Sequence, residues 1–164
     1  MTEITIRSYT PEDEADVIAV VKQMQAHEMQ FFDRMRPVSN IGPPYITGLI
    51  AEIKGPHGRF LVADHQSQAI AFATLDLNKQ RKDDRYEVDY TYAQVEELAV
   101  LEPYRGQGIG QKLLAHCERL AQEAGHKWLR ISLITENPLA SRAYSRAGFG
   151  PLSTTLEKVI DRDS

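Results

Sequence analysis

The sequence has very little cysteine, with one residue, Cys117, among 164. A single cysteine excludes an internal disulfide framework and every metal site that needs several cysteines. The five histidines show no paired ligand spacing, so we expect no metal. Cys117 lies among apolar residues at helical spacing, which favours a buried structural thiol over a nucleophile.

Long apolar runs are also missing. The longest, such as residues 69–73, have five residues, whereas a membrane-spanning helix needs about 20. The N-terminus has no basic region leading into an apolar one, so we expect no secretory signal peptide. These absences predict a cytoplasmic protein with no membrane partner.

Positive charge is in slight deficit, with 19 basic and 23 acidic residues and a net charge of -4. A weak negative field disfavours a protein that holds nucleic acid through its overall charge, and it suits a cationic small substrate. The length and the 42% hydrophobic content fit one domain that spans residues 1–164.

Apolar periodicity and chain breakers divide the sequence into strands and helices. The expected strands cover residues 4–6, 60–63, 69–75, 92–101 and 128–133, and the stretch up to 160 is weakly strand-like. The expected helices cover residues 11–31, 46–54, 108–124 and 137–148. Residues 78–89 are rich in charge and predict a solvated loop or hairpin tip. This order predicts an α/β fold with a mixed sheet and helices on its faces.

The segment from Val95 to Gly110 carries the most chemical information. A strand runs into a proline-started turn and then into glycines that open an amphipathic helix. Backbone N–H groups therefore converge at a helix N-terminus and form an anion site, to which Arg105 adds a cation. The alternative is a turn that merely starts a helix, and three glycines at alternate positions after an arginine weaken it.

The spacing of these glycines excludes two nucleotide-binding loops. A Walker loop begun at Gly106 needs glycine at position 111, where Gln111 stands. A dinucleotide fingerprint begun at Gly108 needs glycine at position 113, which is Leu113, and an acid where Arg130 stands. Neither motif is present.

The loop resembles instead the pyrophosphate loop of the Gcn5-related N-acetyltransferase (GNAT) superfamily, R-G-x-G-x-[GA]. Residues 105–110 read RGQGIG and match every fixed position. About thirty residues later, residues 136–149 (ENPLASRAYSRAGF) resemble the second signature of that family, N-x-x-[AS]-x-x-x-Y-x-x-x-G-F. The resemblance is specific over residues 91–150 and only topological over the N-terminal half.

This resemblance implies a twisted mixed sheet of about six to seven strands with helices on both faces. It also implies an N-acetyltransferase that uses acetyl-CoA as co-substrate, whose pantetheine arm pairs with the strand before the loop. The Leu98 N–H would then point at the thioester carbonyl. The residues expected to bind acetyl-CoA are Leu98, Ala99, Val100, Arg105, Gly106, Gln107, Gly108, Ile109, Gly110, Gln111, Asn137, Ser141 and Tyr144.

Two catalytic residues follow from the resemblance. The acceptor amine must lose a proton, so the site needs a base. Glu96 matches the position of the general base in several family members, while Glu97 and water alone stay open as alternatives. Tyr144 matches the tyrosine that gives a proton to the leaving thiolate, although it also fits the inward face of a short helix. Asn137 is expected both to cap that helix and to bind the pantetheine.

The reaction and its acceptor are the remaining questions. We expect direct transfer to a primary amine of a small molecule or peptide in a ternary complex. A catalytically inactive module that senses acetyl-CoA is the alternative. Acceptor specificity is expected in residues 25–45 and 79–89, where no motif helps, and a homodimer stays open.

Overall fold

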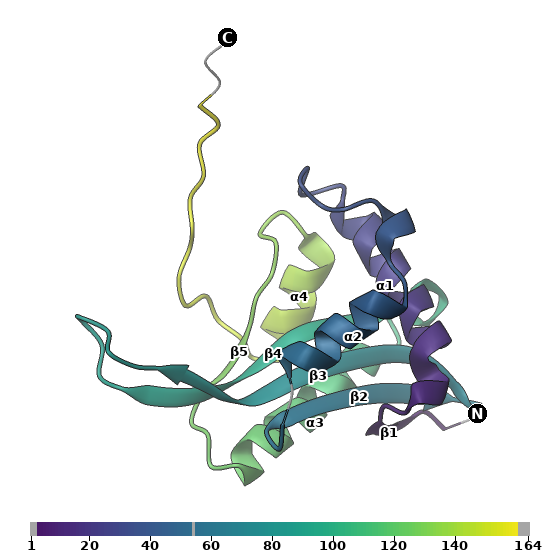
Figure 1. The fold of residues 1–164 in the computed structure, drawn as a ribbon, viewed down its shortest axis with the longest axis horizontal. Coiled ribbons are helices and arrows are strands. Elements are labelled where there is room, and N and C mark those ends of the chain that lie inside the picture. Colours follow the sequence, from purple (N-terminus) through teal and green to yellow (C-terminus); the bar gives the residue numbers. More distant parts are fainter. Residues whose placement is uncertain (1–2, 54, 161–164) are drawn as a thin grey trace.

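The computed structural model describes residues 3–53 and 55–160, and a five-stranded sheet forms its centre (Figure 1). The strand order is β1-β2-β3-β4-β5, with β1 to β4 antiparallel and β5 parallel to β4. The strands are β1 (Thr5–Ser8), β2 (Gly58–His65), β3 (Gln68–Arg81), β4 (Tyr90–Val100) and β5 (Leu129–Ile131). The mixed α/β fold is confirmed, but the expectation of six to seven strands is wrong.

The difference arises at the C-terminal side of the sheet. β5 covers Leu129–Ile131 instead of the expected residues 128–133, and residues 151–160 form no strand. Strand backbone groups need a neighbouring strand for their hydrogen bonds. Within the part of the chain that the structure describes, the outer edge of β5 and residues 151–160 both lack such a neighbour.

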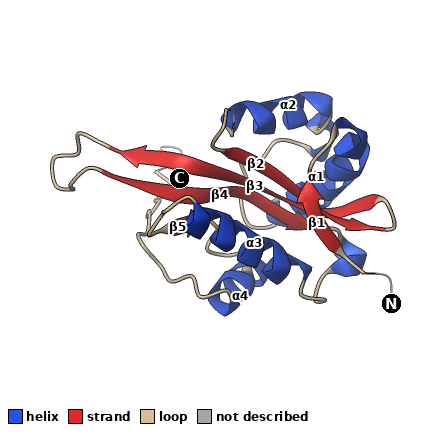
Figure 2. Cartoon of the chain, turned by 90° about the horizontal axis from the view of Figure 1, so that it is seen from below, coloured by secondary structure: helices blue, strands red, loops and turns tan. Residues whose placement is uncertain are grey.

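Helices cover both faces of the sheet (Figure 2). In chain order the α-helices are α1 (Glu14–Glu28), α2 (Pro43–Glu52), α3 (Ile109–Glu123) and α4 (Pro138–Arg146). The first two pack on one face, and the last two pack on the other. A short 3-10 turn with a capping box between Thr10 and Asp13 starts α1. Phe31, which was expected within this helix, follows it in a loop.

Two apolar cores fill the layers between the sheet and the helices. β3 contributes to both and is therefore a nearly continuous apolar run, with Phe72 toward α1 and α2 and Leu75 toward α3. Cys117 of α3 is fully buried in the second layer, and this burial raises the pKa of its thiol to about 12. The expected burial of Cys117 is confirmed, and a thiol with this pKa keeps its proton at neutral pH.

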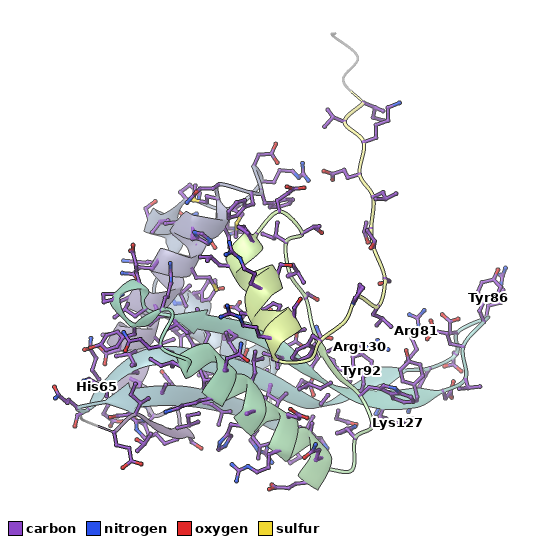
Figure 3. The ribbon with its side chains drawn as sticks, turned by 180° about the vertical axis from the view of Figure 1, so that it is seen from behind. His65, Arg81, Tyr86, Tyr92, Lys127 and Arg130 are labelled. Atoms are coloured by element: carbon purple, nitrogen blue, oxygen red, sulfur yellow. The ribbon has the colours of Figure 1, made fainter. Side chains whose placement is uncertain are left out.

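β3 and β4 continue beyond the body of the sheet as a two-stranded arm (Figure 1). Tyr86 lies at its tip, as Figure 3 shows, and is 88% exposed. The charged stretch predicted at residues 78–89 is thus partly strand, since β3 reaches Arg81.

Neither a membrane span nor a metal cluster was found in the residues described. No helix among them is long and apolar enough to cross a bilayer. No group of three or more His, Cys, Asp and Glu side chains within residues 3–53 and 55–160 could hold a metal ion.

Candidate active site

The strand before the glycine loop leaves one backbone edge open. β5 pairs with β4 only along residues 93–95. From Glu96 onward β4 continues to Val100 along β3 alone. A register shift pairs Glu97 with Thr74 and Val95 with Leu75, so Glu96 is the extra residue of a β-bulge. Past this bulge, no strand within residues 3–53 and 55–160 pairs with the β5 side of β4 at residues 98–100, so this edge is open there.

The hydrogen bonds of β4 show which backbone groups face this open edge. Leu101 N–H donates to the Ile70 carbonyl of β3 at 2.8 Å, and Glu97 N–H donates to Thr74 Oγ1 at 3.1 Å. Because backbone groups alternate along a strand, the N–H groups of Leu98 and Val100 point away from β3. The open edge can therefore pair with an extended ligand as it would with another strand.

The glycine loop is shaped to let a ligand approach its backbone. Gly106 and Gly108 have φ angles of 75° and 79°, and no described atom beyond the flanking residues lies within 4 Å of the position that a Cβ would take. Gly108 is the N-cap of α3 and supplies no side chain to the first turn. The N–H groups of that turn are left for an external acceptor, at the positive end of the helix dipole.

Arg105 fixes this loop to the strand before it. Its Nε donates to the Val100 carbonyl at 2.9 Å. This bond agrees with the alternation along β4, since it shows that the Val100 carbonyl points away from β3. Arg105 therefore holds the loop against the open edge in addition to bringing a positive charge.

α4 forms the facing wall. Asn137 is buried and caps the helix, with Oδ1 accepting from the Ala140 N–H at 3.3 Å. Gln111 Nε2 donates to the Ala143 carbonyl at 2.7 Å and joins α3 to α4. Tyr144 is 9% exposed, and burial, together with the charge of Glu28, raises its pKa to about 12. At neutral pH the Tyr144 hydroxyl is therefore a proton donor.

These elements surround one cleft of about 340 Å³. The expected residues that line it are Leu98, Ala99, Val100, Arg105, Gly106, Gly108, Ile109, Gly110, Gln111, Asn137 and Tyr144. Two others do not. Gln107 turns away and donates to the Pro103 carbonyl at 3.0 Å, and Ser141 is exposed on α4.

Nine further residues line the cleft that were not among those expected to bind acetyl-CoA, namely Met24, His27, Glu28, Tyr104, Leu139, Ala140, Arg142, Ala143 and Arg146. The first three lie at the end of α1 and reach the cleft through packing that no local motif records. His27 Nε2, for example, is 3.4 Å from Asn137 Oδ1. The two arginines lie one turn apart on α4 and bring two cations to the cleft. Their i, i+4 spacing within the second motif was a usable signal.

Glu97 has the properties that a proton acceptor requires. The Tyr45 hydroxyl donates to its Oε1 at 2.7 Å. Its Oε2 is buried and has no hydrogen-bond partner among the described residues. Burial raises the pKa of Glu97 to about 7, against the Tyr45 hydrogen bond and with the help of nearby carboxylates such as Glu28. Glu97 thus titrates near neutral pH with one oxygen available for a proton.

Glu96 is engaged elsewhere. Its carboxylate forms an ion pair with Lys79 of β3 and accepts from Gln94 Nε2 at 3.3 Å. Neither Glu96 nor Glu97 lines the cleft itself. Glu28 does line it, and the negative charge of Glu28 contributes to the raised pKa of Glu97. The expected preference for Glu96 over Glu97 is therefore not supported by its contacts, because the bulge places the two carboxylates among different partners.

The cleft suits a ligand with an extended amide arm and a phosphate group. The open N–H groups of Leu98 and Val100 would pair with the arm. The loop at Gly106 and Gly108, the first turn of α3, and the arginines of α4 would hold the phosphates.

Comparisons with known proteins agree with this arrangement. Residues 22–149 match the sequence profile of the acetyltransferase (GNAT) family. The chain is 24% identical over 144 residues to an aminoalkylphosphonate N-acetyltransferase of Salmonella typhimurium, which covers 88% of this chain and 83% of that protein. It is 40% identical over 57 residues to a streptothricin acetyltransferase of Streptomyces lavendulae, covering 34% of this chain and 29% of that protein.

Solved structures show the same fold. A mutant of the BH1408 protein from Bacillus halodurans superposes with a TM-score of 0.84 at 19% identity, covering 95% of this chain and 99% of that one. An aminoglycoside N-acetyltransferase in complex with CoA superposes with a TM-score of 0.67 at 18% identity, covering 98% and 96%.

Proposed function

This chain belongs to the acetyltransferase (GNAT) family and is an acyltransferase, and from that premise we propose that it transfers the acetyl group of acetyl-CoA to a primary amine. The amine attacks directly in a ternary complex, and its source is a small molecule or a peptide. The observation that carries the proposal is the meeting of an open strand edge with a glycine-started helix in one cleft.

Acetyl-CoA supplies an activated acyl group with a thiolate as its leaving group. Leu98 and Val100 would hold the pantetheine through their free N–H groups, as the geometry of β4 allows. The backbone of residues 106–110 would bind the pyrophosphate, and Arg142 and Arg146 line the same cleft with two positive charges. Asn137 would add a side-chain contact from its position at the start of α4.

Glu97 accepts the proton of the amine in our proposal. The support is its free, buried Oε2, its pKa of about 7, and the hydrogen bond by which Tyr45 fixes the other oxygen. A base with this pKa is half ionised at neutral pH and can take the proton that the amine nitrogen loses when it bonds to the thioester carbon and becomes more acidic. Glu96 is the weaker candidate, since Lys79 neutralises it.

Tyr144 stabilises the leaving thiolate. It lines the cleft from α4, and its pKa of about 12 keeps the phenol protonated at neutral pH. A free thiol has a pKa of about 8.5, so complete proton transfer from this phenol to the thiolate is unfavourable. Tyr144 therefore donates a hydrogen bond to the sulfur as negative charge develops on it, and the thiolate takes its proton from solvent after release.

The acceptor is an amine with further positive charge. Glu28 brings negative charge to the side of the cleft formed by α1, and Glu28 and Glu52 both act electrostatically on Glu97 behind it. This field attracts a cation and disfavours an anionic substituent such as a phosphonate. The acetyltransferases of similar sequence act on aminoalkylphosphonates and on streptothricin, so both classes belong in the test.

Measuring the thiol released from acetyl-CoA distinguishes an enzyme that transfers the acetyl group from a module that only binds acetyl-CoA. Purified protein is mixed with acetyl-CoA and a panel of amines, namely a monoamine, a polyamine, an aminoalkylphosphonate and a peptide N-terminus, and the released thiol is measured. We expect thiol release with the polycationic amine. Binding of acetyl-CoA without thiol release from any amine would support a sensor instead, and absence of binding would refute the assignment of the cleft.

A further inference from the structure

His27, near the end of α1, meets Asn137, the N-cap residue of α4, across the cleft. α1 and α4 pack on opposite faces of the sheet. β5 pairs with β4 only along residues 93–95, and past that point no strand among residues 3–53 and 55–160 pairs with this side of β4, so the two helix ends can meet there. His27 Nε2 lies 3.4 Å from Asn137 Oδ1, although 110 positions separate the two residues in the chain. This contact joins the wall formed by α1 to the wall formed by α4.

The capping hydrogen bond determines which way the Asn137 amide faces. Its Oδ1 accepts from the Ala140 N–H at 3.3 Å, as the N-cap residue of a helix does. A backbone N–H can only donate, so the oxygen of the amide, and not its nitrogen, faces the first turn of α4. The Nδ2 amino group therefore faces away from that turn.

The same oxygen determines the role of His27. An amide oxygen accepts hydrogen bonds and cannot donate one, so His27 must donate from its Nε2–H. The oxygen has two lone pairs and can accept from Ala140 and from His27 together. A flip of the amide would turn its NH₂ group toward two donors. The pair of hydrogen bonds therefore holds the amide in one orientation more firmly than the cap alone would.

The Nδ2 group of Asn137 is left for a ligand. Asn137 is 5% exposed and lines the cleft. Within the part of the chain that the structure describes, its side-chain hydrogen bonds all go to Oδ1, and Nδ2 has no acceptor. A buried NH₂ group without an acceptor is unfavourable. The amide carbonyls of a pantetheine arm in the cleft would supply one.

The ring of His27 is itself held in place. It meets the ring of Phe31 edge-on, with 5.2 Å between the centroids and 72° between the planes. Phe31 lies four residues further along, in the loop after α1. Aromatic pairs favour this edge-to-face arrangement, which restricts the rotation of the His27 ring. His27 is thus a donor in a fixed position, and it lines the cleft beside Asn137.

From these contacts we propose that His27 is a positioning residue, which holds the amide of Asn137 so that Nδ2 donates to a carbonyl of the pantetheine arm. The inference rests on the proposed function, because it needs acetyl-CoA in this cleft. His27 does not touch the reacting atoms and acts through Asn137. Loss of the His27 donor should weaken the binding of acetyl-CoA about 2- to 10-fold, the range expected for one hydrogen bond.

Calorimetric titration with two ligands tests the proposal. The first is acetyl-CoA, and the second is 3′-phospho-ADP, which is the nucleotide part of coenzyme A without the pantetheine arm. His27→Phe keeps a ring against Phe31 and removes the donor, so it should weaken the binding of acetyl-CoA and leave that of 3′-phospho-ADP unchanged. His27→Gln keeps an N–H donor near the position of Nε2 and should restore most of the affinity for acetyl-CoA.

A double variant shows whether His27 acts through Asn137. Asn137→Ser keeps an oxygen that can cap α4 and removes the Nδ2 donors, so it should weaken the binding of acetyl-CoA by itself. Adding His27→Phe to Asn137→Ser should cause no further loss, since the amide that His27 holds is gone. If the two losses multiply instead, His27 acts independently of Asn137 and the proposal is overturned.

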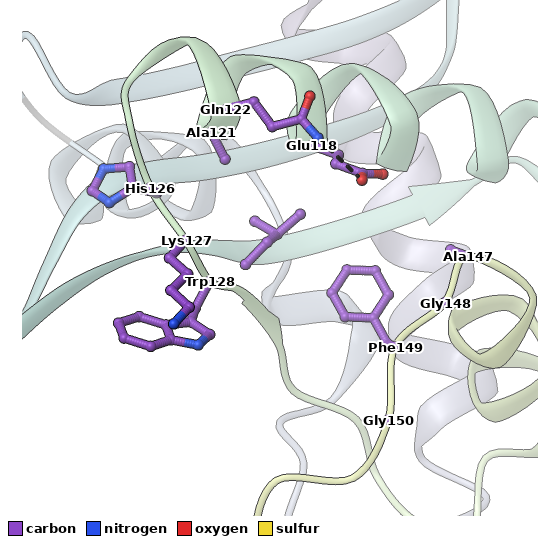
Figure 4. Close-up of a pocket in the computed structure, with 11 residues that line it drawn as sticks. Glu118, Ala121, Gln122, His126, Lys127, Trp128, Ala147, Gly148, Phe149 and Gly150 are labelled. Carbon is purple, nitrogen blue, oxygen red and sulfur yellow. Dashed lines mark hydrogen bonds between the residues drawn. The ribbon is translucent and has the colours of Figure 1, made fainter.

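His126 offers a matched control beyond the C-terminal end of α3. It lines a separate hollow of about 290 Å³ together with Trp128 and Phe149 (Figure 4), and its Nε2–H donates to the Leu77 carbonyl. His126→Phe removes the same kind of donor outside the cleft. The affinities of this variant for both ligands should equal those of the wild type.

The outcomes separate this inference from the proposed function. If the wild-type protein does not bind acetyl-CoA, the proposed function fails and the inference fails with it. If the wild type binds acetyl-CoA and His27→Phe binds it equally well, or loses affinity for both ligands alike, only the positioning role is refuted. Unchanged binding of 3′-phospho-ADP shows that a variant is folded, so a loss confined to acetyl-CoA does not come from unfolding.

Discussion

Replacing Tyr45 by Phe should move the pH dependence of catalysis. In the wild type the Tyr45 hydroxyl donates to Glu97 Oε1 at 2.7 Å, and this bond stabilises the ionised carboxylate. Phe keeps the ring and removes the donor. The pKa of Glu97, already raised to about 7 by burial, should therefore rise further. A base must be ionised to accept a proton, so the acid limb of kcat/KM against pH should shift upward.

The size of the shift follows from the strength of the lost bond. A hydrogen bond to a charged group contributes about 1.5–3 kcal/mol, and one pKa unit corresponds to about 1.36 kcal/mol. The limb should therefore move by about one to two pH units. At pH 7 the ionised fraction of Glu97 would fall from about one half to between about 9% and 1%, which lowers kcat/KM about 5- to 50-fold. At a pH two to three units above 7, Glu97 is ionised in both proteins and the difference in kcat/KM should disappear.

The assay is thiol release at saturating acetyl-CoA, from pH 6 to pH 10, for the wild type and the variant with the same amine. Ionisation of the amine affects both proteins equally and cancels in the ratio of their rates. Tyr9→Phe is the matched control, because Tyr9 stacks on Phe60 away from the cleft. If Tyr45→Phe lowers the rate by one factor at every pH, Tyr45 only packs and the argument for Glu97 loses its support.

Four further substitutions test the remaining parts of the site. Tyr144→Phe should lower turnover about 10- to 1000-fold at every pH with an unchanged affinity for acetyl-CoA in titration calorimetry. Gly108→Val forces a side chain into a left-handed conformation, so this variant should lose the stabilisation of about 2.7 kcal/mol that acetyl-CoA gives at 100 times its Kd, as measured by thermal unfolding. Glu97→Gln should raise the melting temperature relative to the wild type, by an amount that increases between pH 5 and pH 8. The pKa of Glu97 is raised in the folded state, so the wild-type protein loses up to about 3 kcal/mol of folding stability as the pH rises through 7, and the variant does not. Glu96→Gln should leave the acid limb in place and cost less than about 1 kcal/mol of stability in urea titrations, since it removes only a partly exposed ion pair with Lys79.

Local patterns were sufficient for the cofactor side of the site. The glycine loop and the start of α4 depend on backbone conformations that a few neighbouring residues determine. Gly108 adopts a left-handed φ, and Asn137 caps its helix through its own side chain. The apolar stripe of α3, including Cys117, is likewise local. Eleven of the residues expected to bind acetyl-CoA therefore line one cleft in the structure.

The acceptor side depends on contacts between distant parts of the chain. Glu28 reaches the cleft because α1 crosses the sheet, and Tyr45 meets Glu97 because α2 packs above β4. No spacing within α1 or α2 records either contact. The short β5 has a similar origin, because the length of an edge strand depends on what pairs with its outer side and not on its own propensity.

Position in the motif alone does not decide whether Glu96 or Glu97 is the base. An offset from the Leu98–Val100 segment assigns the base to Glu96 if side chains alternate strictly. The bulge adds one residue on β4 opposite Thr74 and Leu75 and interrupts that alternation. Lys79 then forms an ion pair with the carboxylate of Glu96, and the Tyr45 hydroxyl donates a hydrogen bond to that of Glu97. Since a bulge is defined by the partner strand, its effect on these two residues could be found only once β3 and β4 were aligned in space.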